Sequence, residues 1–90
     1  MPTIRFTTAL KRFFPDLVDQ EISGNTVKDI LVQVNQRYPG IQSYLIEETG
    51  GLRKHINIFV RGELITDRSG LQDELGAQDE VVIFQALSGG

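Results

Sequence analysis

The residues with the most unusual chemistry are the last two, Gly89 and Gly90. Glycine has no side chain and reaches backbone angles that are closed to other residues, so a chain ending in two glycines is slim. We expect residues 87–90 to form a flexible tail carrying the one carboxylate that is not on a side chain. Such a group fits a narrow channel that excludes any Cβ. The alternative is a frayed end or a cloning remnant.

Side chains of the kinds that usually catalyse reactions are scarce. The sequence has no cysteine, which excludes a disulfide, a thiolate metal site and a cysteine nucleophile. Its single histidine, His55, lacks a second ligand of the usual type, and we interpret it as strand-edge structure. Glu47 and Glu48 are adjacent, but a glycine-flanked loop offers no cleft to shift their pKa. The sequence therefore predicts no metal site and no acid–base pair.

Composition limits the class of protein. Ninety residues form one small domain, and 40% hydrophobic content supports a modest core. The net charge of −3 argues against a nucleic-acid partner held by phosphate neutralisation. No apolar run approaches the roughly 18 residues that cross a membrane, and the N-terminus has no signal-peptide pattern. We expect a soluble cytoplasmic domain without nucleic acid or membrane as partner.

One main helix is predicted over residues 26–38. Thr26 fits an N-cap, and Asp29 stands three residues later in a capping-box position. The apolar residues that follow at helical spacing share one face: Val27, Ile30, Leu31, Val34 and Tyr38. Pro39-Gly40 ends the helix.

The chain before this helix is predicted to form a hairpin. Residues 3–7 alternate polar and apolar side chains, as a half-buried strand does. Residues 8–15 are the least regular part, and we expect a loop that folds its aromatic rings onto the core. Residues 16–23 then predict an irregular second strand, with Val18 and Ile22 as its apolar positions.

The chain after the helix is predicted to complete the sheet. The clearest strand is 55–60, with Ile56, Ile58 and Val60 on one face and Phe59 on the other. The remaining expected elements are a short helical turn within 41–48, a tight turn at Arg61-Gly62, a returning strand at 63–65, a turn or 3₁₀ segment at 70–75 and a final strand at 81–85. One helix against one mixed sheet is a two-layer α+β domain, with the last strand beside the first.

Taken together, these features resemble the ubiquitin-like β-grasp family, specifically its sulfur-carrier branch. That branch includes the small subunit of molybdopterin synthase, the thiamine sulfur carrier and a carrier used for cysteine synthesis. The resemblance rests on the strand at 4–6, the capped helix with its Tyr38-Pro39-Gly40 stop, the run 55–63, and 81–84 followed by Gly89-Gly90. It implies a β-grasp domain over residues 1–86, with one main helix on a mixed four- to five-stranded sheet, and a flexible Gly-Gly tail at 87–90.

The resemblance also implies a mechanism. In this family an activating enzyme uses ATP to adenylate the terminal carboxylate, here that of Gly90, and sulfur then replaces AMP to give a thiocarboxylate. A second enzyme receives the tail and takes the sulfur: a molybdopterin synthase large subunit, a cysteine-synthase-like enzyme or a thiazole synthase. Gly89 allows close approach, and Leu87 and Ser88 extend through the channel. The carrier itself binds no cofactor or metal.

A partner-binding face is predicted from strand alternation. If Val81 and Ile83 point into the core, then Val82 and Phe84 point outward, as does Phe59. Three apolar side chains on an open sheet face form a patch of the kind that marks interfaces, although scattered surface hydrophobics are common. We expect Phe59, Val82 and Phe84 to bind a partner enzyme. Arginines that could pair with its acidic residues are Arg5, Arg61 and Arg68.

Other functions remain open at this point. The same activated Gly90 could form an isopeptide bond with lysine, as in a protein modifier, and Lys11, Lys28 and Lys54 would allow self-conjugation. A binding-only β-grasp domain is a third reading. The sequence does not name the pathway that receives the sulfur. Its length favours the molybdopterin or cysteine type over the shorter thiamine carrier.

Overall fold

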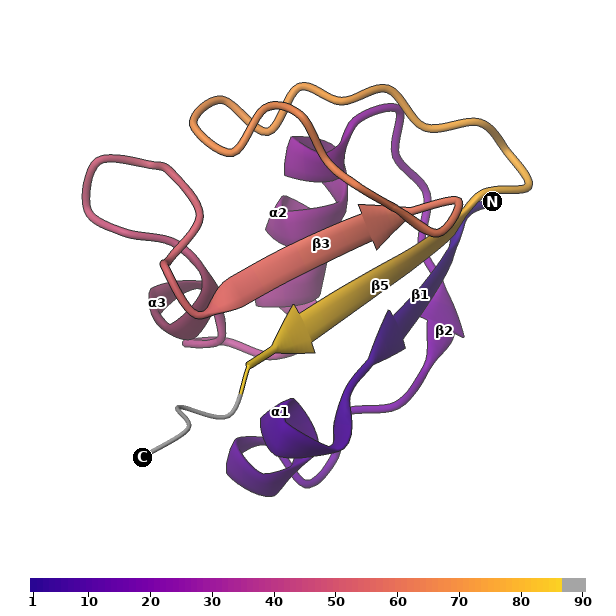
Figure 1. The fold of residues 1–90 in the computed structure, drawn as a ribbon. Helices are drawn as coiled ribbons and strands as arrows, with labels where there is room; N and C mark the ends of the chain where they lie inside the picture. Colours follow the sequence, from indigo (N-terminus) through magenta and orange to yellow (C-terminus); the bar gives the residue numbers. More distant parts are fainter. Residues whose placement is uncertain (87–90) are drawn as a thin grey trace.

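The computed structural model describes residues 1–86, which form a five-stranded sheet with one long helix packed across it (Figure 1). In chain order the elements are β1 (Thr3–Phe6), α1 (Thr8–Phe13), β2 (Gln20–Glu21), α2 (Val27–Arg37), α3 (Gln42–Leu45), β3 (Ile56–Val60), β4 (Glu63–Leu64) and β5 (Glu80–Gln85). The sheet order is β2-β1-β5-β3-β4, with β5 parallel to β1 and antiparallel to β3. The predicted two-layer α+β architecture is confirmed, including the last strand beside the first.

The core lies between α2 and the inward face of the sheet. Alternation along the strands and the helical stripe on α2 place apolar side chains toward each other across this space, as predicted. The buried residues that these elements contribute are Ile4, Phe6, Val27, Ile30, Leu31, Val34, Ile56, Ile58, Val60, Val81 and Ile83. The inward and outward faces of β3 and β5 are therefore assigned correctly by the sequence.

Helix α2 begins with the predicted capping box. The Asp29 N–H donates to Thr26 Oγ1 at 3.2 Å, and the Thr26 N–H donates to the Asp29 carboxylate at 3.3 Å. The N–H groups of Val27 and Lys28, the first two residues of the helix, donate to backbone carbonyls of the segment 71–73, at 3.1 and 2.8 Å. The first turn of a helix leaves its N–H groups without intrahelical partners, so a distant loop completes the cap.

The expectation of a loop over residues 8–15 is wrong, because the chain forms helix α1 there. Leu10 is fully buried and anchors the helix, and Phe14 packs partly buried against the core as expected. Phe13 points outward and stays exposed. A helix of six residues is too short to show an apolar stripe, which is why periodicity did not reveal it.

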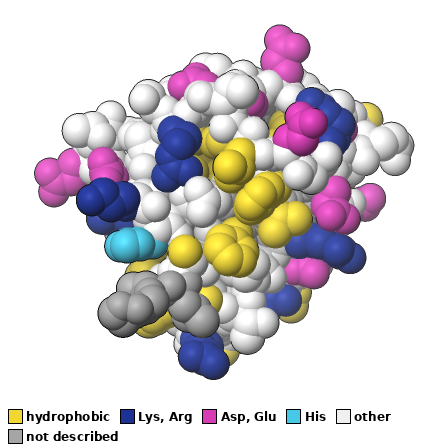
Figure 2. All heavy atoms as spheres, in the orientation of Figure 1, with side chains coloured by type: hydrophobic (Ala, Val, Ile, Leu, Met, Phe, Trp, Pro, Cys, Tyr) yellow, Lys and Arg dark blue, Asp and Glu magenta, His cyan; other side chains and the backbone are white. Residues whose placement is uncertain are grey.

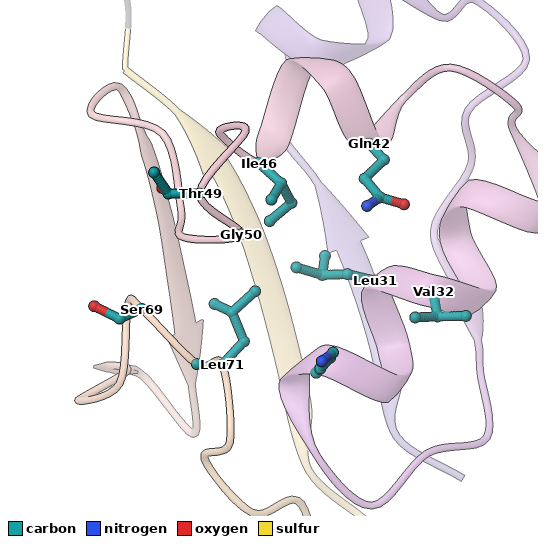
Figure 3. A pocket seen from close by; sticks show the side chains of 10 residues that line it. Leu31, Val32, Gln42, Ile46, Thr49, Gly50, Ser69 and Leu71 are labelled. Atoms are coloured by element: carbon teal, nitrogen blue, oxygen red, sulfur yellow. The ribbon is translucent and has the colours of Figure 1, made fainter.

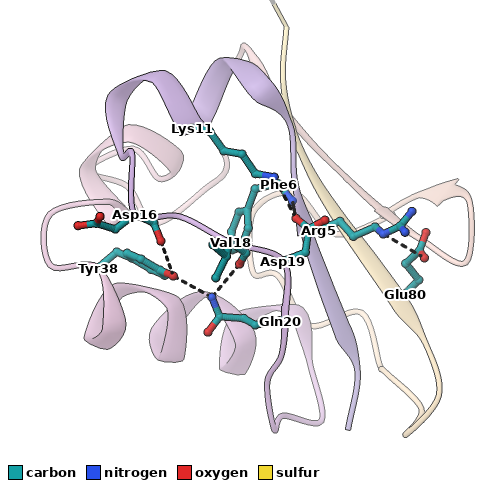
Figure 4. Close-up of polar contacts among 9 residues, drawn as sticks. All are labelled: Arg5, Phe6, Lys11, Asp16, Val18, Asp19, Gln20, Tyr38 and Glu80. Atoms are coloured by element: carbon teal, nitrogen blue, oxygen red, sulfur yellow. Dashed lines mark hydrogen bonds and ion pairs between the residues drawn. The ribbon is translucent and has the colours of Figure 1, made fainter.

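The second strand is shorter than predicted. Only Gln20–Glu21 pairs with β1, and Leu17 rather than Val18 is buried. The Asp19 carboxylate accepts the Phe6 N–H at 3.0 Å (Figure 4) and so takes the place of a strand carbonyl. This side-chain bond lies just beyond the paired residues, where the ladder has ended and Leu17 faces the core.

Tyr38, the last residue of the predicted helix, joins α2 to this irregular segment. Its hydroxyl donates to the Asp16 carbonyl at 3.2 Å and accepts from Gln20 Nε2 at 2.9 Å (Figure 4). The helix itself ends at Arg37, just before the Pro39-Gly40 stop. The Tyr38 ring packs partly buried against the core, while its hydroxyl forms the hydrogen bonds to Asp16 and Gln20.

The remaining turns agree with the sequence. Arg61 and Gly62 both have positive φ, 54° and 81°, as the tight turn of a two-residue hairpin requires. Helix α3 supplies the expected helical turn. Of the two forms expected at 70–75, a turn or a 3₁₀ segment, the structure has a turn at residues 68–70 and no 3₁₀ helix, and Leu71 and Leu75 pack on the core as predicted. Among residues 1–86, no helix is long and apolar enough to cross a membrane.

Candidate functional site

The end of β5 is fixed on both sides. The Gln85 N–H donates to Thr7 Oγ1 at 3.3 Å, and the Ala86 N–H donates to the backbone carbonyl of His55 at 2.8 Å. His55 immediately precedes β3, and its side chain is exposed, so its part in this clamp is made by the backbone. The middle strand of the sheet thus holds the chain firmly as far as Ala86.

The predicted tail residues follow directly on this clamp. Leu87, Ser88, Gly89 and Gly90 lie outside the described residues, so their predicted roles stay predictions. What the described structure supplies is the base from which they begin. That base is the end of the central strand β5, which lies between α1 and α3 (Figure 1).

The outward side chains of β3 and β5 form an apolar patch on the open face of the sheet (Figure 2). Phe59 and Val82 are half-buried, Phe84 is 38% exposed, and the two phenyl rings meet edge to face with centroids 6.4 Å apart. Leu64, 55% exposed, is opposite Phe59 in the hairpin and extends the patch. We call these four residues the open-face patch.

Leu64 was missed by the sequence reasoning. The returning strand was predicted, but no face was assigned to its side chains. A signal was available, because a two-residue turn at Arg61-Gly62 fixes the register and sets Leu64 opposite Phe59. Residues directly opposite in an antiparallel pair share a face of the sheet.

Of the three arginines that could pair with a partner, two form ion pairs within the chain. Arg5 lies 3.6 Å from the Glu80 carboxylate (Figure 4), and Arg61 pairs with Asp79. Both arginines are largely exposed. The Glu80 carboxylate is exposed too, and exposed ion pairs contribute only about 0–1 kcal/mol, so a carboxylate of a partner can replace it beside Arg5 at little cost. The Asp79 side chain is largely buried, so the Arg61–Asp79 pair is not of this exposed kind.

Arg68 differs from the other two because it is held in place by neutral groups. Its guanidinium donates to Asn57 Oδ1 at 3.1 Å and to the carbonyls of Arg53 and Ile56 at 2.8 and 2.9 Å. Among residues 1–86, no carboxylate forms an ion pair with it. Arg68 therefore offers a positioned positive charge beside the Asn57–Phe84 pair of the open face.

A small cavity adjoins the end of β5. It has a volume of about 270 Å³ and is lined by Ser43, Tyr44, Arg53, His55, Ile56 and Gln85. The Gln85 amide oxygen is buried and accepts no hydrogen bond from residues 1–86. Tyr44 also meets the rings of Phe13 and Phe14, with centroids 5.4 and 5.2 Å away. The sequence reasoning did not find this aromatic cluster, because it placed the rings of residues 8–15 on the core.

A second cavity, of about 350 Å³, lies between α2, α3 and the turn at 69–71 (Figure 3). Leu31, Ile46 and Leu71 point into it, and Lys28 is its one ionisable lining residue. A catalytic pocket brings several polar groups together around a reacting atom, often with shifted pKa values. The lining of this cavity does not provide such a group.

Among residues 1–86, the two carboxylates whose pKa is clearly shifted belong to the loop that caps α2. The pKa of Asp67 is lowered chiefly by the N–H of Gly70, and that of Asp73 chiefly by the N–H of Thr66. Asp73 also accepts the Asp67 N–H at 2.8 Å. These bonds fold the loop, so the shifts are structural. Within residues 1–86, no three His, Asp or Glu side chains gather where they could hold a metal ion.

A single main helix across a mixed sheet, with the central strand leading to the chain's end, defines a ubiquitin-like β-grasp protein. The chain belongs to the ThiS family, whose sequence model matches residues 4–90. The sulfur carrier protein CysO of Mycobacterium tuberculosis is 27% identical over 90 residues, which cover 98% of this chain and 97% of that protein.

Solved structures agree with this assignment. The crystal structure of the BexX/CysO complex of Amycolatopsis orientalis contains a chain with a TM-score of 0.85 and 30% identity, covering 100% of both chains. M. tuberculosis CysO has a TM-score of 0.82 at 25% identity, covering 97% of this chain and 100% of that one. SAMP1 from Haloferax volcanii has a TM-score of 0.77 at 26% identity, covering 99% and 98%. The resemblance to sulfur carriers with a β-grasp fold is thereby confirmed.

Proposed function

We propose that this protein is a sulfur carrier that works through the carboxylate of Gly90. The family match that carries this proposal runs through residue 90, the proposed reacting residue. The structure adds a rigid base, because the strand leading to that residue is the central one and is clamped through Ala86. A carrier of this kind needs no catalytic side chains of its own.

The proposed chemistry begins with activation of the Gly90 carboxylate, because a carboxylate is a poor electrophile. An oxygen of the Gly90 carboxylate attacks the α-phosphate of ATP on the activating enzyme, and pyrophosphate leaves. A hydrosulfide equivalent then attacks the acyl carbon and AMP leaves, which gives a thiocarboxylate. The thiocarboxylate sulfur then attacks a carbon of the acceptor substrate and displaces a leaving group from it, which forms a thioester, and water cleaves the acyl–sulfur bond to restore the carboxylate and release the substrate as a thiol. ATP is thus a substrate of the partner enzyme, and this chain binds no cofactor.

The open-face patch is proposed to bind the activating enzyme. Phe59, Val82 and Phe84, together with Leu64, give that enzyme an apolar surface containing two aromatic anchors. Arg68 adds a fixed cation for a carboxylate of the partner. A cytoplasmic location, where ATP is available to the activating enzyme, is part of the same proposal.

The sulfur acceptor is proposed to be a cysteine-synthase-like enzyme. This choice is supported by relatives named CysO, at 27% identity in sequence and up to 30% among solved structures. The neighbour described as a putative molybdopterin converting factor subunit, from Pyrococcus furiosus, is 19% identical, so its likeness concerns the fold alone. Molybdopterin and thiazole synthases are the alternative acceptors.

A second candidate function is protein modification. The SAMP1 structures, of small archaeal modifier proteins, are similar over almost the whole chain, with 26% identity for the Haloferax protein. In that case the adenylated Gly90 reacts with a lysine amine to form an isopeptide bond. Lys28 and Lys54 are exposed and available for self-conjugation.

The two functions are separated by the product that forms on Gly90. After co-expression with the activating enzyme, intact mass spectrometry should show the gain expected when one sulfur replaces one oxygen. Deleting Gly90 is the control and should abolish the gain. A protein that stays unmodified contradicts both functions. Conjugates in which Gly90 is joined to lysine, without thiocarboxylate, favour the modifier.

A further inference from the structure

Two aromatic rings lie exposed at the end of the molecule where β5 finishes. Phe13 of α1 is 55% exposed, and Tyr44 of α3 is 43% exposed, with ring centroids 5.4 Å apart. Their neighbour Phe14 is partly buried, so core packing accounts for it. Core packing does not account for Phe13, which stays largely exposed beside Tyr44 and borders a groove with Tyr38 and Pro39. Apolar side chains gathered in this way on a surface often mark an interface.

These rings lie next to the base of the proposed tail. Helices α1 and α3 flank the end of β5 (Figure 1), and Tyr44 lines the same cavity as Gln85. Thr7, which precedes α1, accepts the Gln85 N–H. Four residues beyond Ala86 span at most about 14 Å when fully extended. An enzyme that acts on Gly90 must therefore bring its surface against this end of the carrier.

Cations and carboxylates both lie at this end of the molecule, and Asp16 borders the same groove as Phe13. Arg12 lies on α1 next to Phe13, and Lys54 precedes His55 in the segment that leads into β3. Within residues 1–86, neither takes part in an ion pair. Arg53 is also here, but it shares a groove with Glu47 and Glu48. On a chain of net charge −3, cations beside two exposed rings are complementary to an acidic surface.

We propose that Phe13 and Tyr44, with Arg12 and Lys54, form a docking surface for the sulfur-accepting enzyme. On the sulfur-accepting enzyme, the complementary surface is an apolar hollow bordered by carboxylates, at the mouth of the channel that takes up the tail. This inference rests on the function proposed above, in which the activating enzyme binds the open-face patch. The carrier must leave one enzyme and enter another with the same tail, and two separate surfaces let each enzyme recognise different residues.

The test compares two steps in the same variants. Phe13→Ser and Tyr44→Ser are loaded with sulfur by the activating enzyme, and their binding to the cysteine-synthase-like enzyme of the same organism is measured by titration. We expect thiocarboxylate formation to stay within about twofold of wild type, and the Kd for the acceptor enzyme to rise by about tenfold or more, as for anchor residues. Val32→Ser is the matched control, because Val32 is 45% exposed on α2, and it should change neither step.

The charges are tested by a second variant. Arg12→Glu combined with Lys54→Glu should slow association with the acceptor enzyme and reduce the dependence of that rate on salt, because long-range attraction between exposed charges is screened. Both residues are exposed, so the fold does not depend on them. Phe13→Tyr keeps the ring and should bind like wild type.

Each other outcome overturns the inference in a distinguishable way. An unchanged Kd in the serine variants shows that the rings do not bind the acceptor. An equal loss in sulfur loading and in acceptor binding assigns the surface to the activating enzyme or to the fold. A wild-type protein that gains no sulfur overturns the proposed function, and with it the inference.

Discussion

Phe84 illustrates how a side chain on the central strand faces away from the core. It is 38% exposed, and its ring meets Phe59 edge to face on the open side of the sheet. Its neighbour Ile83 points the other way and is fully buried. Two residues that adjoin in sequence therefore face different sides of the sheet, the open face and the core.

Phe84→Asp should slow thiocarboxylate formation by about tenfold or more, because it places a charge where the activating enzyme is proposed to bury a ring. The free energy of unfolding should change little, since the side chain already contacts water. Loading is followed by intact mass and stability by urea unfolding. Val18→Asp, at another exposed apolar position, is the control for an added charge. If Phe84→Asp unfolds the protein, the ring is part of the core and the interface role is wrong.

At the scale of elements, the loop 66–73 and helix α2 stabilise each other. Backbone carbonyls of the loop accept the N–H groups of Val27 and Lys28. The loop in turn is folded around Asp73, whose carboxylate accepts the N–H and the hydroxyl of Thr66, each at 3.0 Å. One carboxylate thus supports the start of a helix that lies more than forty residues earlier in the chain.

The pH dependence of stability follows from this arrangement. The pKa of Asp73 is lowered in the folded protein from its ordinary 3.8, chiefly by the Thr66 N–H. Its stabilising contribution is therefore present above pH 3.8 and is lost as the pH falls through the lowered folded value.

Asp73→Asn should lower the free energy of unfolding at pH 7 by roughly 1 kcal/mol, since the carboxylate is partly in water. It should also flatten the loss of stability below pH 3.8. Urea unfolding across pH 2.5 to 7 measures both effects. Glu48→Gln, in an exposed loop, serves as control and should follow wild type. An acid profile unchanged by Asp73→Asn would show that the lowered pKa carries no stability.

At the scale of the whole molecule, β5 unites the core with the proposed reacting end. It pairs with both β1 and β3, faces α2 through Val81 and Ile83, and continues to the clamp at Ala86. Because β5 contacts both neighbouring strands and α2, a change that disrupts β5 also destabilises the elements packed against it. Position of the tail and stability of the fold therefore depend on the same strand.

Ile83→Ala should lower the free energy of unfolding by about 2–5 kcal/mol, because it removes a fully buried side chain and leaves a cavity. A small domain has only about 5 kcal/mol or somewhat more in total, so the variant should be partly unfolded and should load sulfur poorly. Val82→Ala, on the open face of the same strand, should cost under about 1 kcal/mol. Equal losses in the two variants would contradict the assignment of faces.

Much of this fold could be predicted because its main signals are local. The capping box at Thr26, the stripe on α2 and the alternation in β3 and β5 depend on spacings of three to four residues or of two. The outward direction of Phe59, Val82 and Phe84 follows from the same alternation. The proposed reacting residue, Gly90, was found from composition and position in the chain, with no tertiary information.

The sequence by itself determined which residues lie inward or outward in the long elements, since backbone geometry sets those periods. The tertiary structure alone decided three things. It made α1 a helix around Leu10, it buried Leu17 in place of Val18, and it brought Phe13 to Tyr44, thirty-one positions away. Each depends on contacts between segments distant in sequence, for which a local pattern carries no signal. Only those contacts show that the base of the Gly89-Gly90 tail adjoins a second exposed surface.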